Sequence, residues 1–238
     1  MANIHNNAKR PCGKRNKKAK IERIVEVTKK MIEEKGYVET NTNRIAQAAG
    51  VSVGLVYKYF PAGKADIAYD ISLRYHSPIA DSIQHINMAE ITKPGFREKL
   101  VRMLLDWIEI HRRNVRFIRA MDIATLLNPF LHEGTAEIVR KTAEKGQPFL
   151  WPGGASTSDD AELEELTLLL FHTVESVILR HVTAMQVCNS DQQLAQFLAD
   201  IVTGAILNKL HNRTRKSRRY SISTRTAGTS LTNSKQSS

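Results

Sequence analysis

Residues 42–60 read TNRIAQAAGVSVGLVYKYF, and this stretch decides the fold. Thr42 is an N-cap residue type ahead of a short helix that ends at Ala49-Gly50, where glycine can take the left-handed conformation. Ser52 can then cap a second short helix, which continues through about Tyr59. Two short helices joined by a tight turn predict a helix-turn-helix over residues 42–60.

Small and apolar residues within this stretch predict how the two helices pack. Ala46 and Ala49 are small, so the helices can cross closely. The side chains expected to face inward are Ile45, Val51, Val56 and Phe60. Those expected to face outward are Ser52, Val53, Gly54, Leu55, Lys58 and Tyr59, with Tyr57 at the margin. Small groups let a helix enter the major groove of DNA, and hydroxyl and ammonium groups can bond phosphates.

A longer helix is predicted ahead of this stretch, over about residues 17–35. Gly36 is placed to end it, because glycine adopts the left-handed conformation without strain. Its apolar stripe has helical spacing and consists of Ile21, Ile24, Val25, Thr28, Met31 and Ile32. After the helix-turn-helix, Pro61-Ala62-Gly63 breaks the chain, and a fourth helix is expected to start near Lys64.

The rest of the chain has helical patterns and no convincing alternating strand, so the expected fold class is all-α. A second region begins after about residue 76. Its helices are predicted over residues 96–112, 115–127 and 130–145, with a loop over 146–158. Two long helices follow, one starting near Asp159 and one at a capping box, Ser190-x-x-Gln193, that ends near Leu210. Their apolar stripes fit either an intramolecular core or half of a four-helix dimer interface.

Positive charge is concentrated at the two ends of the chain. The formal net charge is +11; residues 1–20 hold seven Lys and Arg, residues 209–238 hold eight, and neither end has an acid. Such polar ends cannot bury enough apolar surface to order themselves, which predicts disordered basic tails over residues 1–16 and 211–238. Attraction to DNA and simple solubility explain these tails equally well.

Several other classes of protein are disfavoured by the composition. No stretch approaches the roughly 20 apolar residues of a membrane span, and the polar N-terminus lacks the apolar core of a secretory signal. A cytoplasmic protein that does not contact a membrane is therefore expected. Cys12 and Cys188 are too few for a disulfide framework or a zinc motif, and are expected to be two unpaired thiols.

Candidate catalytic or metal-binding residues are few. His172 and Glu175 share a helical face, but a metal site needs a third ligand that cannot be placed, so a pocket-lining or core pair is favoured and neither metal nor cofactor is expected. Arg112, Arg116 and Arg119 form a stripe at helical spacing, for which a solvated face is favoured over an anionic-effector site. The sequence has no phosphate loop, nucleophile elbow or HExxH motif, so an enzyme is not expected.

Residues 21–70 closely resemble the DNA-binding domain of the tetracycline-repressor (TetR) family of transcriptional regulators. The matching residues are Thr42, Ile45-Ala46, Ala49-Gly50-Val51-Ser52, Gly54, Tyr57, Tyr59-Phe60 and Lys64, with Gly36 ending the preceding helix. The loop before Lys64 is one residue longer than in the commonest family pattern, which bears on the reach of Lys64 and not on the fold. Beyond residue 70 the resemblance is architectural.

The resemblance implies a domain order and a set of partners. Residues 17–76 would form a three-helix, helix-turn-helix DNA-binding domain. Residues 77–210 would form a helical domain that binds a small-molecule effector and makes a homodimer, usually through its last two helices. The partner would be double-stranded operator DNA, and repression would be the usual outcome.

The family's site residues carry over by matched position. The DNA-contacting residues that the resemblance implies are Thr42, Asn43, Arg44, Ser52, Val53, Gly54, Leu55, Tyr57, Lys58, Tyr59 and Lys64. Val53, Gly54 and Leu55 match base-facing positions and suit contact with thymine methyls, whereas Lys64 matches a phosphate clamp. The candidates for the effector pocket are Trp107, Phe117, Met121, Phe171, His172 and Glu175.

Two rival functions follow from other features of the sequence. A non-specific DNA-coating protein would be driven by the basic tails, and its affinity would depend steeply on salt. An enzyme could occupy the helical domain, but the lack of a catalytic constellation counts against it.

Overall fold

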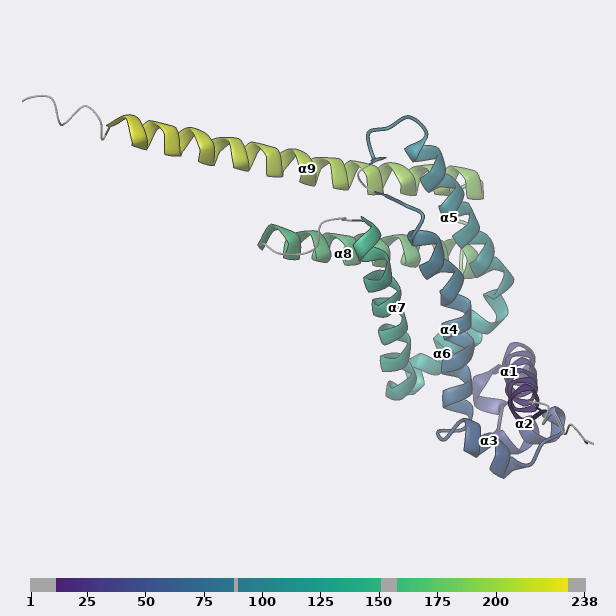
Figure 1. Cartoon of the computed structure of the whole chain (residues 1–238). Helices are drawn as coiled ribbons and strands as arrows, with labels where there is room; N and C mark the ends of the chain where they lie inside the picture. The colour runs from purple at the N-terminus through teal and green to yellow at the C-terminus, as the bar shows by residue number, and fades with distance from the viewer. Residues whose placement is uncertain (1–11, 88–89, 151–157, 231–238) are drawn as a thin grey trace, which may run out of the picture. The chain divides into compact units, whose positions relative to one another are not determined.

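The computed structural model describes residues 12–87, 90–150 and 158–230, and every regular element in these ranges is a helix (Figure 1). The helices are α1 (Cys12–Glu39), α2 (Thr42–Ala49), α3 (Val53–Tyr59), α4 (Lys64–Ile83), α5 (Phe96–Arg113), α6 (Val115–Leu127), α7 (Pro129–Leu150), α8 (Ser158–Thr183) and α9 (Asp191–Ser230). The all-α fold class is confirmed.

The chain divides into two compact units, and each unit is discontinuous in sequence. The first comprises residues 1–79 and 110–142, and the second comprises residues 80–109 and 143–238. The division predicted at residue 76 does not coincide with this one. Helix α4 continues past residue 76, and α6 returns to pack against α1 within the first unit.

One hydrophobic core in the first unit joins the helix-turn-helix to helices from later in the chain. The predicted stripe of α1 supplies Ile24, Val25 and Ile32, while α6 supplies Phe117 and Met121. The other buried members are Tyr37, Ile45, Ala46, Ala49, Val56, Phe60, Ile67, Ala68, Ile71, Ala124 and Leu131. Because all these helices bury apolar area in one core, the burial stabilises the helix-turn-helix and α6 together.

Gly36 interrupts α1, as the sequence predicted. Its φ of 83° lies in the left-handed region, and the helix resumes beyond the kink as far as Glu39. The hydroxyl of Thr40 donates to the carbonyl of Gly36 at 2.9 Å. This bond satisfies one of the carbonyls that a helix end leaves open.

Three predicted helix boundaries were wrong. Helix α1 begins at Cys12 rather than near Lys17, α7 continues to Leu150 through the start of the predicted loop, and α9 continues to Ser230 rather than ending near Leu210. The sequence has neither glycine nor proline between residues 204 and 228, so nothing in this segment breaks the helix. The described parts of the predicted disordered tails, residues 12–16 and 211–230, are thus helical, while residues 1–11, 151–157 and 231–238 lie outside the described residues.

In the second unit, α5, α8 and α9 carry most of the buried apolar side chains. Trp107 packs edge-to-face on Phe171, with ring centroids 5.7 Å apart, and its indole N–H donates to Ser82 Oγ at 2.6 Å. Arg97 makes a bidentate ion pair with Asp200 at 2.6 and 3.0 Å. Other buried members are Phe96, Leu100, Leu104, Ile108, Val174, Ile178, Leu194, Leu198, Val202 and Ile206.

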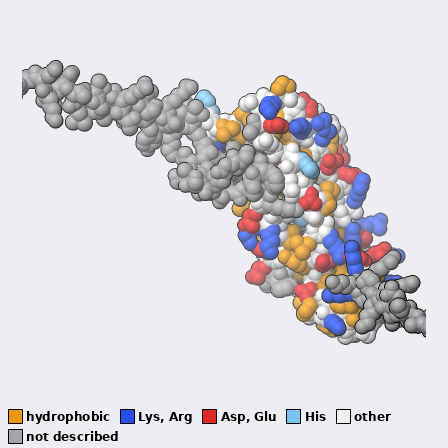
Figure 2. Space-filling model, in the orientation of Figure 1, with side chains coloured by type: hydrophobic (Ala, Val, Ile, Leu, Met, Phe, Trp, Pro, Cys, Tyr) orange, Lys and Arg blue, Asp and Glu red, His pale blue; other side chains and the backbone are white. Residues whose placement is uncertain are grey.

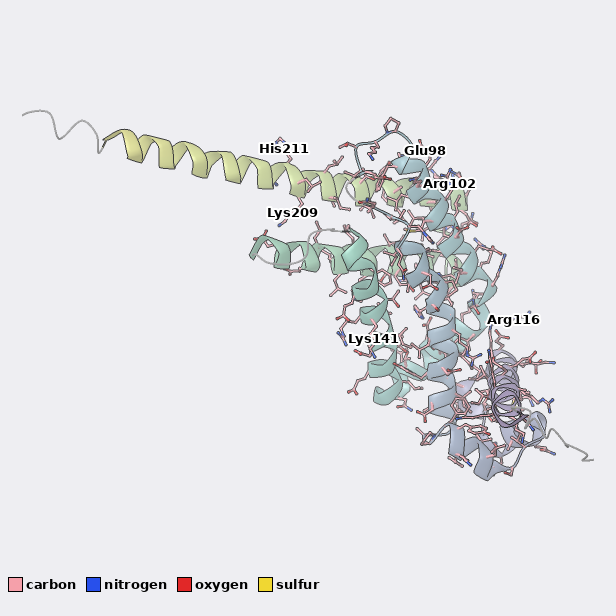
Figure 3. All side chains as sticks on the ribbon, in the orientation of Figure 1. Glu98, Arg102, Arg116, Lys141, Lys209 and His211 are labelled. Carbon is pink, nitrogen blue, oxygen red and sulfur yellow. The ribbon has the colours of Figure 1, made fainter. Side chains whose placement is uncertain are left out.

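The connection between α8 and α9 is held by side chains at both helix ends. Ser190 Oγ accepts from the backbone N–H of Gln193 at 3.1 Å, which confirms the N-terminal half of the predicted capping box. The buried ring of His181 accepts the N–H of Val187 at Nδ1, so Nε2 carries the proton that faces Asp191 at 3.0 Å. Lys209, labelled in Figure 3, also pairs with Glu162 across the two helices.

Candidate nucleic-acid interface

The N-cap of helix α2 lies one residue earlier than predicted. Asn41 is the N-cap, and its side chain accepts the backbone N–H of Arg44 at 3.0 Å. The prediction of Thr42 as the N-cap was therefore wrong, because the preceding asparagine is an equally good cap and holds the extended backbone that a cap requires. Thr42 is instead the first residue of the helix.

The turn between α2 and α3 is built as the sequence predicted. Gly50 has a left-handed φ of 64°, and its N–H donates to the carbonyl of Gln47 at 3.1 Å. The next N–H, that of Val51, donates to the carbonyl of Ala46 at 3.0 Å. Ser52 caps α3 by accepting the N–H of Leu55 at 3.2 Å. Local backbone chemistry thus fixes the angle between the two helices.

The predicted inward face is confirmed. Ile45, Ala49 and Val56 have no exposed surface, and Ala46 is 1% exposed. Val51 is the exception, since it is half-buried and packs against the edge of the core. The two alanines leave room for the helices to cross, and the larger side chains on either side keep α2 and α3 in register.

The outward face of α3 consists of polar and small groups. Ser52, Gly54 and Lys58 are exposed, and Tyr57 is 48% exposed rather than marginal. Three other predicted contacts are half-buried, namely Val53, Leu55 and Tyr59. Tyr59 packs against the core, and the ammonium of Lys17 lies 5.6 Å from its ring centroid. On α2, Asn43 and Arg44 are both exposed.

A glycine in the loop after α3 lies close to two of the predicted DNA contacts. Gly63 is buried with a φ of 62°, and its N–H donates to the carbonyl of Phe60 at 2.8 Å. A Cβ atom at this position would lie 3.1 Å from both Thr42 Oγ1 and Tyr57 Cε1. The carboxylate of Asp66 accepts the N–H of Ala62 at 2.7 Å. The longer loop therefore closes tightly onto the helix-turn-helix, a contact that the sequence did not predict.

Replacing Gly63 with alanine is expected to lower the free energy of unfolding by about 1–2 kcal/mol, because an L-residue is strained in the left-handed region. The added methyl group also presses on Thr42 and on the ring of Tyr57. Urea unfolding followed by circular dichroism measures the loss. Gly204→Ala on α9 is the control, since a Cβ there meets nothing within 4 Å and alanine favours a helix by about 1 kcal/mol. Equal stability of the Gly63→Ala variant and the wild type would contradict the prediction.

Lys64 lies at the start of α4, as predicted, but its ammonium is bound within the protein. Nζ donates to the carbonyl of Tyr37 at 2.6 Å and lies 3.4 Å from that of Val38. It also lies 4.0 Å from the ring centroid of Tyr37. Burial lowers the pKa of Lys64, partly opposed by Glu39, and burial raises the pKa of Tyr37. A hollow of about 240 Å³ is lined by Tyr37, Val38, Lys64, Ala124 and Asn128.

The six effector-pocket candidates differ in their surroundings. Phe117 and Met121 belong to the core of the first unit, whereas Trp107 and Phe171 form the aromatic pair of the second. Glu175 is buried. His172 is exposed, with its ring centroid 6.3 Å from that of Phe171. Within the described residues, no group of three His, Cys, Asp or Glu side chains is arranged to hold a metal ion.

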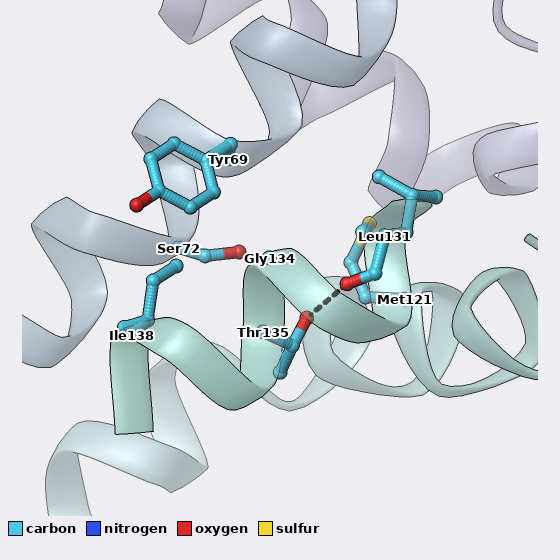
Figure 4. A pocket seen from close by; sticks show the side chains of 7 residues that line it. All are labelled: Tyr69, Ser72, Met121, Leu131, Gly134, Thr135 and Ile138. Atoms are coloured by element: carbon cyan, nitrogen blue, oxygen red, sulfur yellow. Dashed lines mark hydrogen bonds between the residues drawn. The ribbon is translucent and has the colours of Figure 1, made fainter. Parts of the chain in front are cut away.

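A small cavity in the first unit was not predicted from the sequence (Figure 4). It has a volume of about 10 Å³, which is room for about one water molecule. Gly134 allows the ring of Tyr69 to approach α7, since a Cβ there would lie 3.2 Å from Tyr69 Cδ2. The lining residues are Tyr69, Ser72, Met121, Leu131, Gly134, Thr135 and Ile138. Only Met121 was among the predicted pocket residues, because the others carry no sequence signal beyond ordinary core positions.

The stripe of arginines on α5 and α6 faces outward. Arg112, Arg116 and Arg119 are all exposed, and Arg116 is labelled in Figure 3. Figure 2 shows Lys and Arg side chains mixed with Asp and Glu on the described surface in view. None of the described helices is long and apolar enough to span a membrane.

Comparison with known proteins places the N-terminal helices in a family. The model of the bacterial regulatory proteins of the tetR family matches residues 24–70. No curated protein sequence matches the chain significantly.

Solved structures resemble more of the chain. A structure from Mesorhizobium loti MAFF303099, assigned to the TetR family of transcriptional regulators, is 20% identical, with a TM-score of 0.55 over 81% of this chain and 96% of that one. A TerR/AcrR-family transcriptional regulator from Aquifex aeolicus VF5 is 20% identical, with a TM-score of 0.53 over 76% and 96%. The TetR-family repressor AlkX from Dietzia sp. strain DQ12-45-1b is 17% identical, with a TM-score of 0.52 over 79% and 95%.

These similarities extend the shared fold beyond the helix-turn-helix. At such identities the structural matches establish the fold, and the family match over residues 24–70 identifies the domain that carries α1 to α3. Residues 24–70 thus form a DNA-binding domain of the kind found in bacterial regulatory proteins of the tetR family, with its helix-turn-helix in α2 and α3.

Proposed function

We propose that this protein is a homodimeric repressor that binds a near-palindromic operator and leaves it when a small-molecule effector binds. The observation that carries the proposal is the exposed face of α3. Exposed on α3 and its N-cap are a serine, a glycine, a tyrosine and a lysine, while Val56 on the same helix is buried in the core. Small groups admit the helix to the major groove, and the hydroxyl and ammonium groups reach phosphates.

Roles on this face follow from exposure and chemistry. Ser52, Tyr57 and Lys58 contact phosphates, since all three are exposed and can donate hydrogen bonds. Gly54 faces the bases, with Val53 and Leu55 on either side against thymine methyls. The remaining proposed contacts approach the backbone from the start of α2 or the end of α3, and they are Thr42, Asn43, Arg44 and Tyr59.

Two copies of the chain are needed to read such an operator. Each copy places α3 in one of two successive major grooves, whose centres are about 34–36 Å apart. A two-fold protein reads two equivalent half-sites, so the operator is a near-palindrome. The protein acts in the cytoplasm, where bacterial DNA lies. The copies associate through α8 and α9, on which Leu169 and Phe197 are 61% and 55% exposed.

Effector release requires two conformations of the dimer. An effector shifts their balance only by its different affinity for the two states. We place its site near the aromatic pair of Trp107 and Phe171, with Glu175 as the polar group that gives orientation. The small cavity beside Tyr69 has room for about one water molecule, so a larger ligand would have to part the helices there.

Selection of bound duplexes from a random pool tests the proposal with the full chain. A near-palindrome with half-sites about one helical turn apart is expected. The selected duplex then shows whether binding is specific at physiological salt. Enrichment of no sequence at all would refute the proposal and favour the non-specific coating protein.

Replacing Tyr57 with phenylalanine is expected to weaken binding to the selected duplex by about 0.5–1.5 kcal/mol, the usual contribution of one hydrogen bond. The ring that packs against Gly63 remains, so the fold is kept. Fluorescence anisotropy with a labelled duplex measures the change. Tyr69→Phe on α4 is the matched control, and unchanged affinity is expected for it. Equal affinity of the Tyr57→Phe variant and the wild type would remove the Tyr57 hydroxyl from the interface.

A further inference from the structure

The last carbonyls of α1 can accept hydrogen bonds beyond those that the helix itself makes. Beyond the kink at Gly36, α1 ends at Glu39, and the carbonyl of Tyr37 accepts the N–H of Thr40 in a long bond of 3.3 Å. The ammonium of Lys64 donates to the same carbonyl at 2.6 Å, across 27 positions of sequence, and lies 3.4 Å from the carbonyl of Val38. A cation beside the carbonyl end of a helix is also favoured by the helix dipole.

Besides the two carbonyls, the ammonium of Lys64 faces an aromatic ring. Nζ lies 4.0 Å from the ring centroid of Tyr37, and that ring is 8% exposed. A lysine ammonium has three N–H groups. The two carbonyls and the ring face are therefore enough partners for the three N–H groups. A DNA phosphate would have to displace one of these partners to bind the ammonium.

Lys64 connects the two ends of the helix-turn-helix. Residues 37 and 38 lead through Asn41 into α2, while Lys64 begins the helix that follows α3 and the Pro61–Gly63 turn. The bond between them holds the beginning of α2 to the end of the loop after α3. This contact therefore adds to the buried core as a link between α3 and the end of α1.

We propose that Lys64 is a positioning residue for DNA recognition, acting through the end of α1 and not as a phosphate clamp. This proposal rests on the proposed DNA-binding function. It departs from the role that the family resemblance implies, because the ammonium is already bound within the protein. Loss of the contact would let α2 and α3 shift together, which harms the fit to a particular base sequence more than general attraction to DNA.

Salt dependence separates the two roles. Loss of one phosphate contact lowers the slope of log affinity against log salt by about 0.9 and weakens all duplexes alike. Loss of a positioning contact leaves the slope unchanged and lowers the ratio of specific to non-specific affinity. We expect Lys64→Met in the full chain to weaken binding to the selected duplex about tenfold, with the wild-type slope and little change on a random duplex.

Lys58→Met is the matched control, since Lys58 is exposed on α3 and is proposed to contact phosphate. Its slope should fall by about 0.9 on both duplexes. Circular dichroism at the assay temperature shows whether each variant is folded. If Lys64→Met is unfolded, Lys64→Gln carries the same test, because its amide keeps an N–H donor without the charge.

The outcomes also separate this proposal from the function on which it rests. A wild-type protein without sequence preference would refute the proposed function. A specific wild-type protein whose Lys64 variants lose about 0.9 of slope, like Lys58→Met, would leave that function intact and overturn the positioning role. Lys64 variants with wild-type affinity and specificity would overturn it as well.

Discussion

Replacing Phe117 with alanine is expected to lower the free energy of unfolding by about 3–5 kcal/mol, the usual cost of truncating a buried phenylalanine. Phe117 lies on α6 and is 2% exposed. It belongs to the core that α6 shares with the helices of the DNA-binding domain. The cavity left by the ring cannot collapse without moving those helices. Urea unfolding followed by far-ultraviolet circular dichroism measures the change.

The matched control for this substitution lies on the same helix. Ile123 is 61% exposed, so Ile123→Ala is expected to change stability by no more than about 0.5 kcal/mol. DNA affinity should fall with the Phe117→Ala variant at temperatures where the core is partly unfolded, and should be unchanged for Ile123→Ala. If the free energy of unfolding of the Phe117→Ala variant lay within about 1 kcal/mol of the wild-type value, the phenyl ring would not contribute to a core shared by α6 and the helix-turn-helix.

Introducing glutamate at both Leu169 and Phe197 is expected to weaken operator binding by about 10²–10⁴-fold. These side chains are 61% and 55% exposed on the last two helices, where we propose that two copies meet. Four carboxylates buried between the copies would cost more than the apolar contact contributes. The separated chains would bind half-sites one at a time and lose the effective concentration that a dimer provides. Light scattering after size exclusion and anisotropy on the selected duplex measure both effects.

Leu126→Glu serves as the control for the dimer variant. Leu126 is 86% exposed on α6, outside α8 and α9, and its substitution should leave both mass and affinity unchanged. A dimeric double variant with wild-type affinity would show that the copies associate through another surface. A monomeric wild type that binds a palindrome tightly would show that two-fold association is not needed for recognition.

Helix ends that depend on nearby residues were predictable, and those that depend on distant ones were less so. The turn at Gly50 and the cap at Ser52 need only their own neighbours, and both were predicted correctly. The N-cap of α2 was misplaced by one residue, because Asn41 and Thr42 have similar capping preferences. The start of α1 and the end of α9 lie further out in the chain than predicted, because a highly charged, polar composition indicates disorder whether or not the segment can form a helix.

By itself, the sequence determined the all-α class and the helix-turn-helix, because caps, turns and apolar spacing act over a few residues and leave a local pattern. Only the tertiary structure decided that the ammonium of Lys64 donates to the carbonyl of Tyr37, and that the ring of Tyr57 lies close to Gly63. Every residue type has a backbone carbonyl, so the sequence does not indicate which carbonyl Lys64 bonds. A glycine in a loop likewise does not indicate which side chain packs against it. Contacts of this kind depend on how the helices pack, so no regular pattern of residues in the sequence predicts them.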